Sequence, residues 1–194
     1  YILTKAQAYR DLPRSFVQFG RARWVQIDWL TLSPLFFIAI GVTALIFFLY
    51  HSTAIGRRLL ATGANERAAR LSGVPVERMV QFAHALSGLL SGFAGILLIC
   101  RLGSALPSVG QDWLLPSFAA PIVGGTLLSG GAVSIIGTFF GATLIESVSV
   151  GLTLMNVPSF WIQLFVGLVL LLAVLLDRAR SVMITRGRLL ASAR

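Results

Sequence analysis

Charged residues and cysteine are scarce in this sequence. Asp, Glu, Lys and Arg make up 12% of the 194 residues, about half the share of a typical soluble domain. A surface with so little charge must largely face something other than water. The single cysteine, Cys100, allows neither an internal disulfide nor a cysteine-based metal site, and we expect it to be a small apolar residue near a helix end.

The residue patterns that catalysis requires are also missing. There is no Gly-rich loop with the Lys and Ser of a phosphate site, and the two histidines, His51 and His84, lack the neighbours of a metal site or a catalytic triad. We therefore expect no catalytic residue, metal or cofactor, and a protein that is not an enzyme. The net charge of +9 does not indicate a nucleic-acid partner, because the basic residues lie between apolar blocks and at the C-terminus rather than along one face.

Apolar residues are abundant and arrive in long blocks. They make up 56% of the chain, and the mean hydropathy is +0.84. A spanning helix needs about 20 apolar residues to cross roughly 30 Å of hydrocarbon. Five blocks approach this length, and they predict an all-α, polytopic transmembrane bundle with about five spanning helices, at residues 32–50, 80–100, 114–128, 133–155 and 160–176. The third block is short and contains proline and glycine, so it either spans or forms a re-entrant hairpin.

The distribution of basic residues favours five spans. If all five blocks cross, residues 1–31, 101–113 and 156–159 share one side and carry six Lys or Arg, whereas the other loops and the tail carry ten. Cytoplasmic loops are the more basic ones, so the second set is expected in the cytoplasm. This predicts an extracytoplasmic segment 1–31, a transmembrane bundle 32–176 with a cytoplasmic loop 51–79, and a basic cytoplasmic tail 177–194. The chain begins without methionine, and we expect it to be part of a longer protein.

Small residues recur four apart in two of the blocks. Gly88 and Gly92 form one such pair, and Gly137 and Gly141 form another. Small residues at this spacing let helix backbones approach closely in lipid. We therefore expect a tightly packed bundle, although glycine is common in transmembrane helices in any case.

The loop 51–79 contains the signals of a short isolated helix. Asn65 is a suitable N-cap, Glu66 stands in the first turn, Gly73 suits a left-handed C-cap and Pro75 prevents continuation. The predicted helix covers residues 66–72, about two turns bracketed by glycines. A helix this short is not stable alone, so it packs either on its own membrane domain or on a cytoplasmic partner. The residues leave these two possibilities open.

Several stretches of the chain resemble one family. Residues 56–74 read GRRLLATGANERAARLSGV, residues 85–98 read ALSGLLSGFAGILL, and residues 122–145 read IVGGTLLSGGAVSIIGTFFGATLI. Residues 160–180, FWIQLFVGLVLLLAVLLDRAR, and the N-terminal LPRSFVQFGRA at 12–22 match as well. Together they resemble the ribose-type sugar permeases of bacterial ATP-binding-cassette importers. Family members are about twice as long, so this chain is similar to their C-terminal half.

The resemblance implies a function and a set of partners. In such importers two permease subunits line the translocation path in the inner membrane, two cytoplasmic ATPases drive it, and a periplasmic binding protein delivers the sugar. The short helix would then be a coupling element within the 62–75 loop that docks in the ATPase. The residues that would shape this element or contact the ATPase are Gly63, Asn65, Ala68, Ala69, Arg70 and Gly73.

Further residues are candidates for the lining of the path. Broken helices with proline and glycine tend to line cavities, which points to the stretch 121–129 with Pro121, Gly124, Gly125 and Ser129. The alternative is a helix kinked only to fit its neighbours. Glu146 is the one carboxylate at apparent membrane depth, where ionisable residues usually face a path or a partner helix. It could equally be a residue near a helix end or a protonated structural carboxyl, and family members usually carry a neutral residue there.

Other functions remain open at this point. Permeases of the same superfamily carry branched-chain amino acids or autoinducer-2, although the ATGANERAARLSG run favours the sugar branch. A secondary transporter or channel would need no ATPase, but it is expected to show coupling-ion carboxylates or a filter loop. A scaffold or anchor subunit would have little need for so many small residues.

Overall fold

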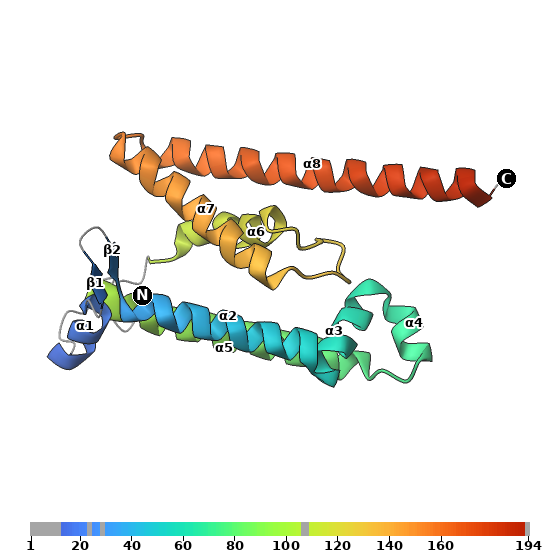
Figure 1. Cartoon of the computed structure of the whole chain (residues 1–194), viewed down its shortest axis with the longest axis horizontal. Coiled ribbons are helices and arrows are strands. Elements are labelled where there is room, and N and C mark those ends of the chain that lie inside the picture. The colour runs from blue at the N-terminus through green and yellow to red at the C-terminus, as the bar shows by residue number, and fades with distance from the viewer. Residues whose placement is uncertain (1–12, 23–24, 28–29, 106–108, 193–194) are drawn as a thin grey trace, which may run out of the picture. The chain divides into compact units, whose positions relative to one another are not determined.

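A computed structural model describes residues 13–22, 25–27, 30–105 and 109–192. The chain divides into two compact units, residues 1–111 and 112–194, which are treated separately below (Figure 1). Helices dominate both units, which confirms the predicted all-α membrane bundle. One small element was not predicted, an antiparallel hairpin of β1 (Val25–Ile27) and β2 (Leu30–Leu32) in which Val25 is opposite Leu32.

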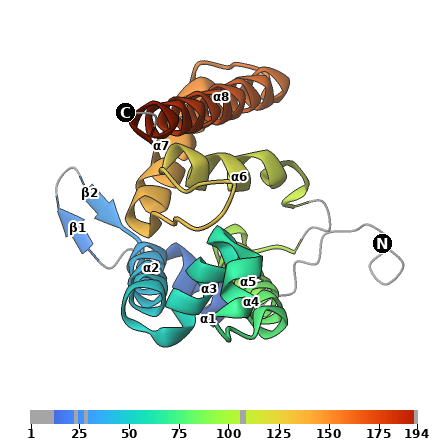
Figure 2. The same cartoon turned by 90° about the vertical axis from the view of Figure 1, so that its right-hand side faces the viewer.

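The first unit is built around two long helices, α2 (Pro34–Ser52) and α5 (Val76–Leu102), with short helices packed against them at each end. The short helices are α1 (Arg14–Arg21), α3 (Ala54–Ala64) and α4 (Glu66–Leu71). Both α1 and α3 contact α2 and α5. Figure 2, which looks along the long helices, shows α1 and α3 lying between α2 and α5. The two long helices are therefore linked mainly through the shorter ones.

Local chemistry explains where the long helices begin and end. Ser33 caps α2 by accepting a hydrogen bond from the Leu35 amide at 3.4 Å, and Pro34 occupies the first helical position, where its missing N–H costs nothing. At the C-terminus of α5, Gly103 has a φ of +72°, and its amide donates to the Ile99 carbonyl at 2.8 Å. A glycine tolerates this left-handed conformation without strain.

The second unit packs three helices around a small core. A 3-10 turn (Gln111–Trp113) leads into α6 (Leu114–Val123), which is followed by α7 (Ile135–Leu154) and α8 (Ser159–Ser192). The buried residues Ala119 and Ala120 of α6 contact Ile145 of α7 and Val166 of α8. Most large apolar side chains elsewhere stay exposed, for example Phe140 at 65% and Leu89 at 66%. Such surfaces suit lipid or further membrane helices rather than water.

Among the residues that the structure describes, three helices are long and apolar enough to cross a membrane: α2, α5 and α7. Helix α6 and residues Ser159–Leu175 of α8 are shorter apolar stretches. Four of the five predicted blocks thus coincide with α2, α5, α7 and the first half of α8. The third block does not form the helix expected. At 1.5 Å per residue, the ten residues of α6 extend only about 15 Å, so this helix alone cannot cross the hydrocarbon.

The helix of the fifth span is longer than its apolar block. The apolar stretch Ser159–Leu175 agrees with the predicted span at 160–176, and α8 continues from it as one helix to Ser192, because no proline follows to stop it. The loop 51–79 was expected to hold one short helix, yet α3 forms ahead of α4. Gly63 therefore lies in the last turn of α3 and does not bracket α4 as a loop residue.

The two glycine pairs behave differently. A Cβ added to Gly141 would lie 2.3 Å from the Ala120 carbonyl oxygen, and one added to Gly137 would lie 1.9 Å from the Gly124 oxygen. The close approach of α6 and α7 confirms the predicted small-residue packing at this pair. For Gly88 and Gly92 on α5, the described part of the chain places nothing within 4 Å of an added Cβ. The packing expected there has no partner among the described residues.

Candidate functional site: the α3–α4 loop and the α6–α7 turn

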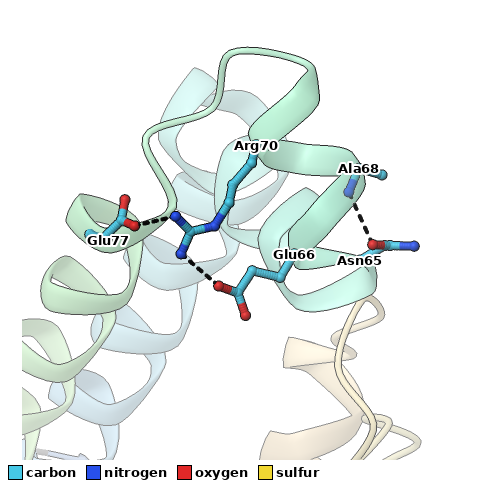
Figure 3. A network of polar contacts seen from close by, with 5 residues as sticks. All are labelled: Asn65, Glu66, Ala68, Arg70 and Glu77. Atoms are coloured by element: carbon cyan, nitrogen blue, oxygen red, sulfur yellow. Dashed lines mark hydrogen bonds and ion pairs between the residues drawn. The ribbon is translucent and has the colours of Figure 1, made fainter.

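The N-terminus of α4 is capped as the sequence predicts. The Asn65 side-chain oxygen accepts the Ala68 amide at 3.0 Å, and Glu66 stands in the first turn, where the helix dipole favours a negative charge (Figure 3). Asn65 also ends α3, because its amide donates to the Ala61 carbonyl at 3.1 Å. One residue thus separates two helices and sets the direction of the second.

The C-terminus of α4 ends in a left-handed cap at Gly73, whose φ is +78°. Its amide donates to the Arg70 carbonyl at 3.0 Å, and the Val74 amide donates to the Ala69 carbonyl at 3.0 Å. This pair of bonds is the Schellman arrangement, which satisfies the last carbonyls of a helix. The helix covers Glu66–Leu71 with Ser72 as its C-cap, one residue shorter than predicted.

Arg70 ties α4 to the beginning of α5. Its guanidinium donates to the Glu66 carboxylate at 2.8 Å and also to the carboxylate of Glu77, in the first turn of α5 (Figure 3). The hydrogen bonds that Arg70 donates to Glu66 and then to Glu77 raise its pKa above the ordinary value, so it stays charged. The sequence suggested Arg70 as a contact to an ATPase. In the structure two of its nitrogens donate to this loop's own carboxylates, although half of the side chain stays exposed.

Thr53 makes the corresponding connection at the other end of the loop, and sequence reasoning missed it. Its hydroxyl donates to the Leu49 carbonyl of α2 at 2.6 Å and accepts the Gly56 amide of α3 at 3.1 Å. Gly56 is buried here, because an added Cβ would lie 2.3 Å from the Leu49 oxygen. The threonine itself was a usable N-cap signal, because its hydroxyl can accept an amide of the first turn.

The surface of α4 has one buried and one strongly exposed apolar position. Ala69 is 5% exposed and faces the loop interior with Val76, which is 1% exposed. Ala68 is exposed, and Leu71 is 90% exposed, the largest value among the large apolar side chains that the structure describes. Leu71 stands beside charged residues and outside every candidate span, so lipid does not explain its exposure.

Four of the five residues predicted to line the path lie together in and beside the α6–α7 turn. Pro121 lies within α6, Gly124 is the C-cap of α6, and Gly125 has a φ of +88°. The Pro121 carbonyl accepts the Thr126 amide at 2.9 Å, which folds the chain back on itself. Ser129 lies exposed in the following turn.

A small hydroxyl network fastens this turn to the first turn of α7. The Thr126 hydroxyl accepts the Ser134 amide at 3.2 Å and lies 3.3 Å from the Thr138 hydroxyl. Ser134 caps α7 by accepting the Gly137 amide at 3.2 Å. The turn is therefore held in one shape, as a fixed break between α6 and α7 would require. The role of its residues in a translocation path stays a prediction.

Glu146 lies apart from this turn, in the middle of α7. Residues 135–145 of the helix precede it and residues 147–154 follow it, so it does not lie near a helix end. Among the residues that the structure describes, no group of three His, Cys, Asp or Glu side chains could hold a metal ion. Cys100 is buried in the last turn of α5, where a Cβ added to Gly20 of α1 would lie 2.3 Å from its carbonyl oxygen.

Comparison with known proteins identifies the family. Residues 2–175 match the model of the branched-chain amino acid transport system / permease component family. The chain belongs to this permease family. It is a multi-pass protein of the inner membrane, and as a permease component it is not itself catalytic.

Three curated relatives of this permease are sugar permeases by name. It is 46% identical to the ribose import permease protein of Bacillus subtilis (strain 168) over 133 residues, which are 69% of this chain and 41% of the relative. It is 44% identical to the xylose transport system permease protein of Escherichia coli (strain K12) over 132 residues, 68% of this chain and 34% of the relative. The ribose import permease protein of Escherichia coli (strain K12) is 40% identical over 134 residues, 69% and 42% of the two chains. The permease chain thus spans about two fifths of such relatives, and no solved structure matches it.

Proposed function

We propose that this permease chain is part of the membrane subunit of an ATP-binding-cassette importer that carries a monosaccharide across the bacterial inner membrane. The observation that carries the proposal is the 40–46% identity to ribose and xylose permeases. The family description names branched-chain amino acids, but the relatives named for ribose and xylose favour the sugar branch. The subunit would work with a second permease subunit, identical or different, and with a periplasmic sugar-binding protein.

The topology of the proposal follows the distribution of charge and the contacts of the first unit. Residues 1–31 would be extracytoplasmic, loop 51–79 cytoplasmic and residues 177–194 a basic cytoplasmic tail. The contact between Gly20 of α1 and Cys100 at the end of α5 supports a common side for residues 1–31 and 101–113. The short α3 and α4 gather at the opposite end of α2 and α5 (Figure 1), as a single cytoplasmic loop requires.

ATP hydrolysis would take place in separate cytoplasmic ATPase subunits, coupled to this chain through α4. A partner can shift the conformation of the membrane helices only by binding one conformation better than another. The capped α4 is connected to α2 through α3 and Thr53, and to α5 through Arg70 and Glu77. A partner bound to α4 is therefore connected to two of the spanning helices. Because Arg70 is engaged within the loop, the outward-facing Leu71 is the better candidate for the docking contact.

Replacing Leu71 by alanine tests this docking. The substitution removes three buried carbon atoms from a docked interface, which is worth about 2 kcal/mol and so about a thirtyfold loss of affinity for the ATPase. Leu71 is 90% exposed, so its loss should leave the fold of the loop unchanged. Leu154, 78% exposed at the end of α7 on the proposed extracytoplasmic side, is the matched control.

The measurement is co-purification of the ATPase with the whole permease, together with uptake of labelled ribose and xylose. Leu71→Ala should lose both the associated ATPase and the uptake, whereas Leu154→Ala should retain both. Normal ATPase association in Leu71→Ala contradicts the docking contact. A permease that binds no ATPase and transports neither sugar contradicts the proposed function as a whole.

A further inference from the structure

The position of Glu146 in α7 places its carboxylate near the centre of the membrane. The twenty residues of α7 extend about 30 Å, the thickness of the hydrocarbon. The middle of the helix falls between residues 144 and 145, so the backbone of Glu146 lies within about 3 Å of that midpoint along the axis. Substrate sites of many transporters lie at this depth.

Two hydroxyl residues share the face of α7 that carries Glu146. With 3.6 residues per turn, Thr143 lies about 60° around the helix from Glu146 and Ser147 about 40° beyond Thr143, so the three residues fall within about 100° of the helix surface. All three side chains are exposed. The buried Gly141 and Ile145, which pack against the rest of the second unit, occupy a different face of the helix. We name Thr143, Glu146 and Ser147 the α7 acceptor face.

The hydrogen-bonding capacity of this face is one-sided. The Thr143 hydroxyl donates to the Phe139 carbonyl at 2.9 Å, and the Ser147 hydroxyl donates to the Thr143 carbonyl at 2.7 Å. Each hydroxyl has thus used its only proton and keeps oxygen lone pairs that can accept. The two ion pairs within the described part of the chain both belong to Arg70, so neither involves the Glu146 carboxylate. The face therefore offers acceptors, including one carboxylate, and no hydroxyl donor.

We propose that the α7 acceptor face lines the water-filled path and accepts hydrogen bonds from the hydroxyl groups of the transported sugar. A carboxylate facing lipid at the bilayer centre is costly, so this face must be covered by water or protein. A row of acceptors complements a ligand rich in O–H donors, whereas the carboxylate repels ligands that carry a carboxylate of their own. This inference rests on the proposed sugar permease and assigns the residues that favour a polyol over an amino acid.

Thiol labelling tests whether the face meets water, independently of what is transported. In the whole permease with its native cysteines replaced, including the buried Cys100, single cysteines are introduced as Glu146→Cys and Leu144→Cys. Leu144 is 54% exposed and lies at the same depth, but about 160° around the helix from Glu146, so it is the matched control. A membrane-impermeant methanethiosulfonate should modify Glu146→Cys at least tenfold faster than Leu144→Cys. Equal or slower modification of Glu146→Cys means that a neighbouring helix or a second subunit covers the face, and it overturns the inference.

Uptake by Glu146→Gln tests the proposed chemistry. Glutamine keeps the size of the side chain but removes the charge, so one charge-assisted acceptor is lost and uptake of ribose and xylose should fall about tenfold. Association with the ATPase should not change, and Leu144→Ala should transport normally. Unaltered uptake in Glu146→Gln overturns the assignment of sugar contacts. If the wild type imports neither sugar, the proposed function fails, whereas the labelling result still decides whether the face lines water.

Discussion

Replacing Gly141 by alanine is expected to push α6 and α7 apart. The added Cβ would lie 2.3 Å from the Ala120 carbonyl oxygen, where ordinary contact begins at 3.4 Å, so the backbones must separate by about 1.1 Å. A gap of this size forfeits up to about half of the dispersion energy between the facing atoms. Overpacking of this kind costs about 1–3 kcal/mol, of which the better helix propensity of alanine recovers up to about 1 kcal/mol. Because the overlap is with backbone atoms, we take the upper end of this cost, about 3 kcal/mol, which leaves a net loss of about 2 kcal/mol.

Thermal unfolding of the detergent-solubilised permease measures this loss. For 150–250 residues, about 2 kcal/mol corresponds to a fall in Tm of about 4–8 °C. The control is Gly151→Ala in the same helix, because nothing in the described chain lies within 4 Å of a Cβ added there. Gly151→Ala should melt at or slightly above the wild-type temperature. The reasoning fails if both variants shift equally, or if Gly141→Ala melts with the wild type.

Two further substitutions test the N-terminal cap of α4 and the packing of α1 against α5. Asn65→Ala removes the acceptor of the Ala68 amide, which should destabilise α4 locally by about 1 kcal/mol. Hydrogen exchange of the α4 amides should then be about fivefold faster. Unchanged exchange would show that the cap contributes nothing to the stability of α4. Gly20→Ala would bring a Cβ within 2.3 Å of the Cys100 carbonyl oxygen, so α1 should move away from α5. The buried Cys100 thiol should then react faster with N-ethylmaleimide. An unreactive Cys100 thiol in Gly20→Ala would mean that α1 stays packed against α5.

The ends of α4 could be predicted because they depend on local chemistry. Asn65, Gly73 and Pro75 act on backbone groups within a few residues of themselves, so the printed sequence contains all the partners. The long apolar blocks could be located for a similar reason, since length and hydropathy are properties of one segment. Their ends were less secure: the charge at residue 177 marks a membrane boundary in the sequence, but it does not interrupt α8.

The remaining features depend on contacts between distant segments. The approach of Gly20 to Cys100 and of Gly137 to Gly124 needs two backbones, and the sequence indicates only one member of each pair at a time. The pairing of Arg70 within its own loop has the same origin. Arginine in a cytoplasmic loop suggests a partner, but Glu77 lies seven residues away across the cap, and only the fold brings it to the guanidinium.

The two connections of loop 51–79 differ in strength, and this difference bears on the proposed coupling to a partner. Thr53 joins α2 to α3 through two short bonds at a partly buried position beside the buried Gly56, so these helices are expected to move as one body. Arg70 joins α4 to α5 through ion pairs whose side chains are at least half exposed, where water and salt weaken them. A partner that displaces α4 would therefore open the Arg70–Glu77 contact before it separates α3 from α2. The motion would reach α2 first, through α3, and α5 would then be held to α2 mainly by the contacts of both helices with α1 and α3.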